Sequence, residues 1–98
     1  MSCLFLTIKP ILLSYLKSVL IRMEQAELKI FIKKIGSRIR ELRTDKKMTQ
    51  LDLAIVSNID ERQIQRLEAS HTSPTIKTLY KISKALDIEL YLLLKFTD

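Results

Sequence analysis

The sequence predicts an all-α protein built as one domain of five helices. Glycine occurs once and proline twice in 98 residues, which leaves few of the turn-makers that a β-sandwich or barrel needs. From Leu28 onward, apolar residues recur at intervals of three and four, the spacing of an amphipathic helix. Hydrophobic residues make up 47% of the chain and charged residues 29%, a composition of folded rather than disordered proteins.

Residues 1–22 form an extra apolar segment with three basic residues and no acidic ones. Lys9, Pro10 and Lys17 interrupt it, so no run reaches the roughly 20 apolar residues that spanning a membrane requires. The order of features in a signal peptide is also missing. Two interpretations stay open: a short amphipathic membrane anchor, or a start assigned too early. We favour the second, with Met23 as the true first residue, a domain over residues 23–96 and no membrane partner.

The first two helices are expected over residues 28–47 and 50–57. Thr49 can cap the amides of the second helix, with Asp52 in the reciprocal position of a capping box. The first helix has a basic outer face around an apolar stripe. That stripe consists of Leu28, Phe31, Ile32, Ile35, Ile39 and Leu42.

Three further helices follow. Asn58 is expected to make the turn before the third helix, because Asn tolerates left-handed backbone, and Asp60 to cap that helix. Residues 70–74 form a polar loop, after which Thr75 caps the fourth helix. The fourth helix carries Ile76, Leu79, Ile82 and Leu86, and a strongly apolar fifth helix is expected over residues 88–96.

The second and third helices are short and joined by a tight turn, over residues 50–67. Ala54 is a small residue where two steeply crossing helices approach, and Ile59, Ile64 and Leu67 supply apolar wedges. At this point the chain resembles the helix-turn-helix family of phage repressors, Cro proteins and XRE-type regulators over residues 35–94. The matching segments are residues 35–43, Thr49-Gln50-x-x-Leu53-Ala54, Ile64-x-Arg66-Leu67-Glu68, Pro74 and Leu79-x-x-Ile82-x-x-Ala85-Leu86. The resemblance implies a compact repressor-like helix-turn-helix domain that binds double-stranded DNA.

The resemblance also implies which residues meet DNA. The third helix would lie in the major groove, with Glu61, Arg62 and Arg66 as base-reading candidates and Gln63 and Gln65 as second-rank contacts. An arginine can bind guanine through two hydrogen bonds. For Glu61, three roles stay open: accepting from a cytosine, sitting at the positive end of its helix, or orienting Gln50. Candidate contacts to the DNA backbone are Thr49, Gln50, His71, Thr72, Ser73 and Lys77.

Arg43 and Glu68 are charged residues that periodicity places against the domain interior. In the family the matching pair is an ion pair that ties the first helix to the end of the recognition helix. Removing one partner would leave a buried charge uncompensated. We therefore expect these two residues to be structural.

The sequence departs from the family pattern in two ways. Lys47, Asn58 and Ser70 stand where the family usually has glycine, so we expect the turns to differ in detail. Apolar residues stand where the family usually has outward charges, and Leu51 and Ile55 are four apart on one face, with Val56 next to them. Exposed apolar stripes usually contact something, so this one is a candidate surface for a protein partner.

The predicted function is a cytoplasmic, nucleoid-associated transcriptional regulator that binds a palindromic operator as a homodimer. The net charge of +6 suits an anionic partner. The dimer contact is expected through Leu90, Tyr91, Leu92, Leu94 and Phe96. One cysteine, one histidine and no recognisable nucleophile–base cluster indicate no enzyme, no metal and no cofactor. The alternative functions are an antitoxin that also binds a toxin through Leu51 and Ile55, and a membrane-associated regulator anchored by residues 1–22.

Overall fold

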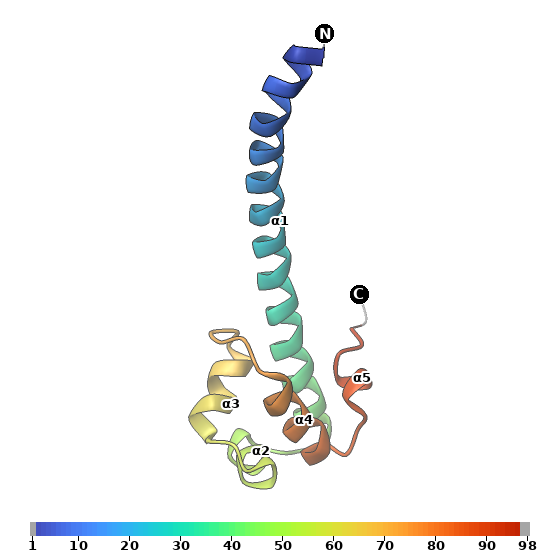
Figure 1. Cartoon of the computed structure of the whole chain (residues 1–98). Coiled ribbons are helices and arrows are strands. Elements are labelled where there is room, and N and C mark those ends of the chain that lie inside the picture. The colour runs from blue at the N-terminus through green and yellow to red at the C-terminus, as the bar shows by residue number, and fades with distance from the viewer. Residues whose placement is uncertain (1, 97–98) are drawn as a thin grey trace. The chain divides into compact units, whose positions relative to one another are not determined.

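The computed structural model describes the backbone of residues 2–96 and the side chains of residues 10–96. Over this part of the chain there are five helices and no strand, which confirms the all-α class (Figure 1). The helices are α1 (Ser2–Asp45), α2 (Gln50–Ser57), α3 (Glu61–Glu68), α4 (Ile76–Ala85) and α5 (Leu90–Leu93). The chain divides into two units, Met1–Ile30 and Phe31–Asp98. The second unit holds the last part of α1 and all the other helices.

The first helix is longer than the sequence pattern predicted. We expected it to begin near Leu28, but α1 begins at Ser2. No glycine lies before Gly36, and Pro10 is the one proline inside the helix, so little in this stretch disfavours helical backbone. The prediction relied on an apolar stripe that faces the domain core, and none of the described side chains before residue 28 belongs to that core. No helix in the described part of the chain is long and apolar enough to cross a membrane.

The starts of α2, α3 and α4 lie where the capping residues predicted them. The Thr49 hydroxyl accepts a hydrogen bond from the Asp52 amide at 3.0 Å, and Asp52 accepts one from the Thr49 amide at 2.9 Å. The Asp60 carboxylate accepts from the Arg62 amide at 3.1 Å. At α4, the Thr75 hydroxyl accepts from the Thr78 amide, also at 3.1 Å. These side chains satisfy amides that the first turn of a helix leaves without a partner.

The turns between the helices keep the left-handed backbone conformation that the family usually gives to glycine. Lys47 has a φ of 58°, Asn58 of 57° and Ser70 of 63°. The left-handed turn predicted at Asn58 is confirmed, and Lys47 and Ser70 adopt the same conformation with side chains present. Asp87, which the sequence did not single out, has a φ of 57° after α4. For a residue such as Lys or Ser this conformation costs about 1 kcal/mol.

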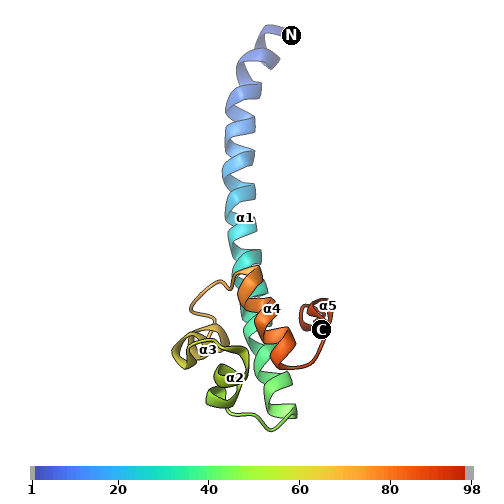
Figure 2. The same ribbon diagram turned by 60° about the horizontal axis from the view of Figure 1, so that its bottom comes forward.

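The hydrophobic core of the second unit draws on all five helices. Figures 1 and 2 show α3 and α5 on opposite sides, with α4 and the last part of α1 between them. The buried apolar residues are Ile35, Ile39, Leu53, Ala54, Ile64, Leu67, Leu79, Ile82, Leu86 and Leu93. Of the apolar residues predicted for α1 and α4, Leu28, Phe31 and Ile76 are instead exposed to solvent.

The fifth helix is shorter than predicted, a single turn rather than the whole of residues 88–96. Leu93 is completely buried in the core. Phe96 packs edge-on against Phe31, with 5.3 Å between ring centroids. Leu94 and Phe96, two residues apart, both pack against the core. Side chains two residues apart point to the same side in non-helical backbone but not in a helix. The helix therefore ends before Phe96 because core packing outweighs local helix propensity.

Gly36 lets α1 approach the end of α3 closely. A Cβ atom at this position would lie 2.5 Å from the Leu67 carbonyl oxygen and 3.2 Å from that of Glu68. Both neighbours are backbone atoms of α3, so they cannot move aside without moving that helix. The glycine is needed for space, since its backbone is ordinary helix.

We predict that Gly36→Ala destabilises the domain by about 1–3 kcal/mol, because the added methyl overpacks the α1–α3 contact. In an exposed helix position the same substitution would stabilise. Urea unfolding followed by circular dichroism measures the difference. Ser37→Ala, at the exposed neighbouring position, is the control and should change stability by less than about 0.5 kcal/mol. A Gly36→Ala variant as stable as the original protein would show that the approach is looser than described.

Candidate nucleic-acid interface

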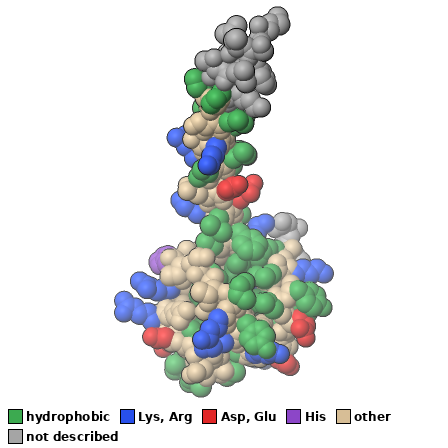
Figure 3. Space-filling model, in the orientation of Figure 1, with side chains coloured by type: hydrophobic (Ala, Val, Ile, Leu, Met, Phe, Trp, Pro, Cys, Tyr) green, Lys and Arg blue, Asp and Glu red, His purple; other side chains and the backbone are tan. Residues whose placement is uncertain are grey.

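The α3 helix has one buried face and one face that points away from the domain. Ile64 and Leu67 are buried, which fixes the orientation of the helix. Arg62 and Arg66 lie on the opposite side, and both are exposed. Gln63 and Gln65 are also exposed and flank the two arginines. Figure 3 shows Lys and Arg side chains standing out from the α3 side of the domain. Four of the five predicted base-reading residues thus share one outward surface.

The fifth base-reading candidate, Glu61, lies differently. It is half-buried at the first position of α3, nearer the core than Arg62. A carboxylate in the first turn interacts favourably with the positive end of its helix. The suggestion that Glu61 orients Gln50 is wrong, because Gln50 donates its hydrogen bond to Glu68 instead, at 3.3 Å.

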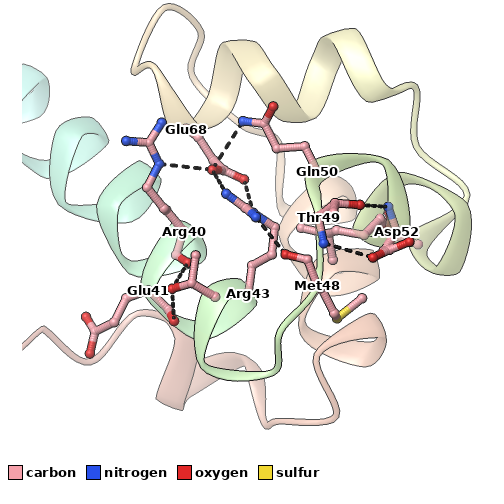
Figure 4. Close-up of polar contacts among 11 residues, drawn as sticks. Arg40, Glu41, Arg43, Met48, Thr49, Gln50, Asp52 and Glu68 are labelled. Carbon is pink, nitrogen blue, oxygen red and sulfur yellow. Dashed lines mark hydrogen bonds and ion pairs between the residues drawn. The ribbon is translucent and has the colours of Figure 1, made fainter.

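Glu68 is the centre of a charged cluster that joins α1, α2 and α3 (Figure 4). Its carboxylate is fully buried and accepts two hydrogen bonds from Arg43, Nε at 2.8 Å and Nη2 at 2.9 Å. Arg40 Nε donates to the same carboxylate at 3.2 Å. The remaining Arg43 nitrogen, Nη1, donates to the Met48 carbonyl at 2.7 Å and so fixes the α1–α2 turn. The predicted Arg43–Glu68 ion pair is confirmed, with two more donors on the carboxylate.

The environment of Glu68 keeps it charged. Burial raises the pKa of its carboxyl, but the hydrogen bonds from Arg43, Arg40 and Gln50, together with the positive charge of Arg43, lower it more. The pKa therefore lies below the ordinary value of 4.5. A carboxyl with a lowered pKa in the folded state stabilises the fold above its unfolded pKa. That stabilisation is lost as the pH falls through the folded value.

The residues predicted to meet the DNA backbone lie beside α3. Thr49 is exposed at the start of α2, and Gln50 braces Glu68 from the first turn of that helix. A hollow of about 360 Å³ lies between α3 and the start of α4. It is lined by Asp60, Arg62, Gln63, Arg66, Leu67, residues 72–75 and Thr78. The hollow brings the two arginines predicted to read bases together with Thr72 and Ser73, whereas His71 and Lys77 are exposed outside its lining.

An apolar stripe on α2 is exposed as predicted. The exposed fractions are 49% for Leu51, 69% for Ile55 and 59% for Val56. On α4, Tyr80 at 53% lines the same small hollow as Val56. None of these side chains belongs to the core, so they form a surface separate from the outward face of α3.

Two arginines have structural contacts that the sequence analysis missed. The basic outer face predicted for the first helix includes Arg38 and Arg40. Arg40 is exposed there and also shares Glu68 with Arg43, and the spacing of three between these arginines is the signal that could have found this contact. Arg38 Nη2 donates to the Leu92 carbonyl at 3.4 Å, which links α1 to α5. This long-range contact has no counterpart in local spacing.

Comparison with known proteins assigns the chain to a family. Residues 39–93 match the helix-turn-helix family. The chain is 32% identical over 66 residues to an uncharacterised HTH-type transcriptional regulator, y4dJ, of Sinorhizobium fredii, covering 67% of this chain and 86% of that protein. The chain therefore belongs to the XRE-type helix-turn-helix family of DNA-binding transcriptional regulators, which are not enzymes.

Solved structures with the same fold include two restriction-modification controller proteins. C.AhdI from Aeromonas hydrophila is 35% identical, with a TM-score of 0.62, over 63% of this chain and 94% of that one. C.Esp1396I, a tetramer in complex with its natural 35-base-pair operator, is 34% identical, with a TM-score of 0.61, over 65% and 88% of the two chains. The clp gene regulator ClgR from C. glutamicum, at 23% identity, shares the fold with a TM-score of 0.62 over 65% of this chain and 83% of that one.

We predict that Glu68→Gln lowers the free energy of unfolding at neutral pH by about 3 kcal/mol, because it leaves the Arg43 charge uncompensated. The loss should shrink as the pH falls below the ordinary glutamate pKa, where the original carboxyl itself becomes protonated. Urea unfolding between about pH 3 and pH 7 measures both effects. The control is Glu41→Gln, an exposed carboxylate paired with Arg38 at 3.4 Å, which should change little. Equal pH profiles for the two variants would contradict the role given to Glu68.

Proposed function

We propose that the chain regulates transcription by binding operator DNA with α3 in the major groove. Arg62 and Arg66 would read base edges, with Gln63 and Gln65 beside them and Glu61 at the edge of the contact. The observation that carries this proposal is the outward face of α3, whose two arginines stand opposite the buried Ile64 and Leu67. Arginine at such a position can form two hydrogen bonds to guanine, worth about 1–3 kcal/mol of discrimination.

Contacts to the sugar-phosphate backbone would hold α3 in register. The candidates surround the helix: Thr49 and Gln50 at the start of α2, His71, Thr72 and Ser73 in the loop after α3, and Lys77 in α4. Such contacts carry no sequence information but set the position of the protein on the duplex. The net charge of +6 supports binding to a polyanion.

We propose further that the chain binds a palindromic operator as a homodimer through an α5 surface, made of Leu90, Tyr91, Leu92, Leu94 and Phe96. Leu93 is buried in the core, and the leucines and Phe96 of this surface are half-buried. Less apolar surface is therefore exposed than the sequence suggested. Tyr91 remains 69% exposed at the centre of the surface. A two-fold pair would set two recognition helices about 34 Å apart, one turn of DNA. C.Esp1396I, which binds its operator as a tetramer, offers a precedent for assembly on DNA.

We propose that the chain consists of an N-terminal extension, residues 1–22, and a DNA-binding domain, residues 23–96. Its place of action would be the cytoplasm, on the nucleoid. Mass spectrometry of the protein made from its own gene would tell whether the chain starts at Met1 or at Met23.

An antitoxin is the second candidate function, and the exposed apolar stripe on α2 favours it. Leu51, Ile55 and Val56 face solvent in the isolated chain, and a toxin would cover them. A toxin gene beside this one, with a product that co-purifies with the chain, would support this candidate over a regulator that binds DNA alone.

We predict that Arg62→Ala and Arg66→Ala relax the preference at particular base pairs, whereas Lys77→Ala weakens binding to all duplexes alike. Selection from random duplexes followed by sequencing measures the preference, and titration at several salt concentrations measures the backbone contacts. Each lost phosphate contact should reduce the salt slope by about 0.9. An unchanged preferred sequence in both arginine variants would refute α3 as the reading helix.

We predict that Tyr91→Lys and Leu92→Lys lower the affinity for a palindromic duplex at least about tenfold, while the affinity for a single half-site stays the same. The reason is that only the palindrome gains from pairing across α5. Tyr80→Lys, at another exposed tyrosine, is the matched control and should leave both affinities unchanged. Equal losses on palindrome and half-site would argue against the α5 surface as the dimer contact.

A further inference from the structure

The Met1–Ile30 unit exposes a regular apolar row along α1. Six residues follow one another at intervals of four, three, four, three and four, which is the heptad spacing of a coiled coil. They are Leu12, Leu16, Val19, Met23, Ala26 and Ile30, and we call them the seam. The exposed fractions are 50% for Leu12, 45% for Leu16, 55% for Met23 and 57% for Ile30. Figure 3 shows hydrophobic side chains along this part of α1.

The other face of the same stretch is mostly polar. Ser14, Lys17, Ser18, Glu24 and Gln25 lie at heptad positions away from the seam, and all are exposed. Ile21 and Leu28 are the two apolar exceptions on that face. A helix with one apolar seam and one polar face usually packs its seam against another element. In the described part of this unit no second element covers the seam, and all its residues are exposed except Val19, which is half-buried.

We propose that the seam packs against the seam of a second copy of this chain, as a short parallel coiled coil with both helices in register. Charge complementarity selects this occupant. Arg22 and Glu27 flank the seam and are five residues apart. In a parallel pair in register, this spacing places Arg22 of one helix opposite Glu27 of the other. Two Arg22–Glu27 pairs would then form by symmetry. An antiparallel pair would bring like charges together across the seam.

The proposed coiled coil has natural ends. The sequence has Lys9 and Lys33 at the next seam positions before Leu12 and after Ile30, so the apolar row stops on both sides. The row covers about 28 Å of helix. Ala26 makes one of the six contacts small, and Leu13, Tyr15 and Leu20 extend the apolar surface beside the seam. We therefore expect a reversible association rather than a permanent one.

The seam and the proposed α5 surface share no residues. The heptad spacing of the seam continues unchanged on both sides of Met23. A chain that began at Met23 would lack Leu12, Leu16 and Val19, half of the seam. To separate the two contacts, every variant below is made in the full chain carrying Tyr91→Lys, and association is measured by sedimentation equilibrium without DNA. Failure of the seam and failure of the α5 contact then give different results.

The first test compares one substitution at two positions of the helix. Leu16→Lys puts a charge in the seam and should raise the dissociation constant of the dimer at least about tenfold. Leu28→Lys makes the same change on the opposite face and should leave the constant unchanged. Circular dichroism checks that both variants keep their helix content. A parent that stays monomeric at tens of micromolar, or equal effects of the two substitutions, would overturn the proposal.

The second test reverses charges. Glu27→Lys should raise the dissociation constant about fivefold, because it places a second positive charge opposite Arg22 of the partner helix. Adding Arg22→Glu should restore the original constant. Glu24→Lys makes the same charge change on the outer face and should have no effect. If the Glu27 and Glu24 variants behave alike, the paired charges play no part and the parallel arrangement is wrong.

The third test fixes direction and register. With Cys3 changed to serine, a single cysteine is introduced either as Leu12→Cys or as Ala26→Cys. After mild oxidation, a parallel pair in register forms disulfide-linked dimers at both positions, whereas an antiparallel pair cannot do so at both. Binding of the monomeric chain to phosphatidylglycerol vesicles, with no dimer in solution, would instead make this segment a membrane anchor and overturn the proposal.

Discussion

The buried carboxylate of Glu68 holds α3 in place. An eight-residue helix is only marginally stable by itself, so α3 depends on what it packs against. Ile64 and Leu67 supply the apolar contact, but such contacts do not by themselves fix the rotation of a short helix. Two hydrogen bonds from Arg43 and one from Gln50 do so, since they tie the last residue of α3 to α1 and α2. The direction in which Arg62 and Arg66 point follows from this arrangement.

Local signals predicted the middle of the domain well and its two ends poorly. Thr49, Asp60 and Thr75 mark helix starts through short-range hydrogen bonds, which depend only on neighbouring residues. The start of α1 and the length of α5 depend on other factors. None of the described side chains before Leu28 packs on the domain core, and at α5 the contact between Phe96 and Phe31 accompanies the early end of a helix that its composition favours. Such tertiary effects are not visible in a single stretch of sequence.

The candidate site was predictable as a set of residues but not as a geometry. Arg62 and Arg66 could be placed on one face by their spacing of four, and both are exposed. The partner of Gln50 could not be predicted, because Glu61 and Glu68 lie on the same side of α3 and only the folded chain decides between them. Arg40 is exposed as predicted, but its contact with Glu68 could not be predicted for a similar reason, since the carboxylate is 28 residues away in sequence.

The left-handed turns at Lys47 and Ser70 have a consequence for how the domain can evolve. Each holds a residue with a side chain in a backbone conformation that glycine adopts freely. Substitution by glycine at either turn would therefore stabilise the fold. A protein with such a reserve can accept a destabilising change elsewhere, for instance a new side chain on α3, and recover stability through one glycine in a turn. The outward residues of α3 can therefore change while the fold that presents them is kept.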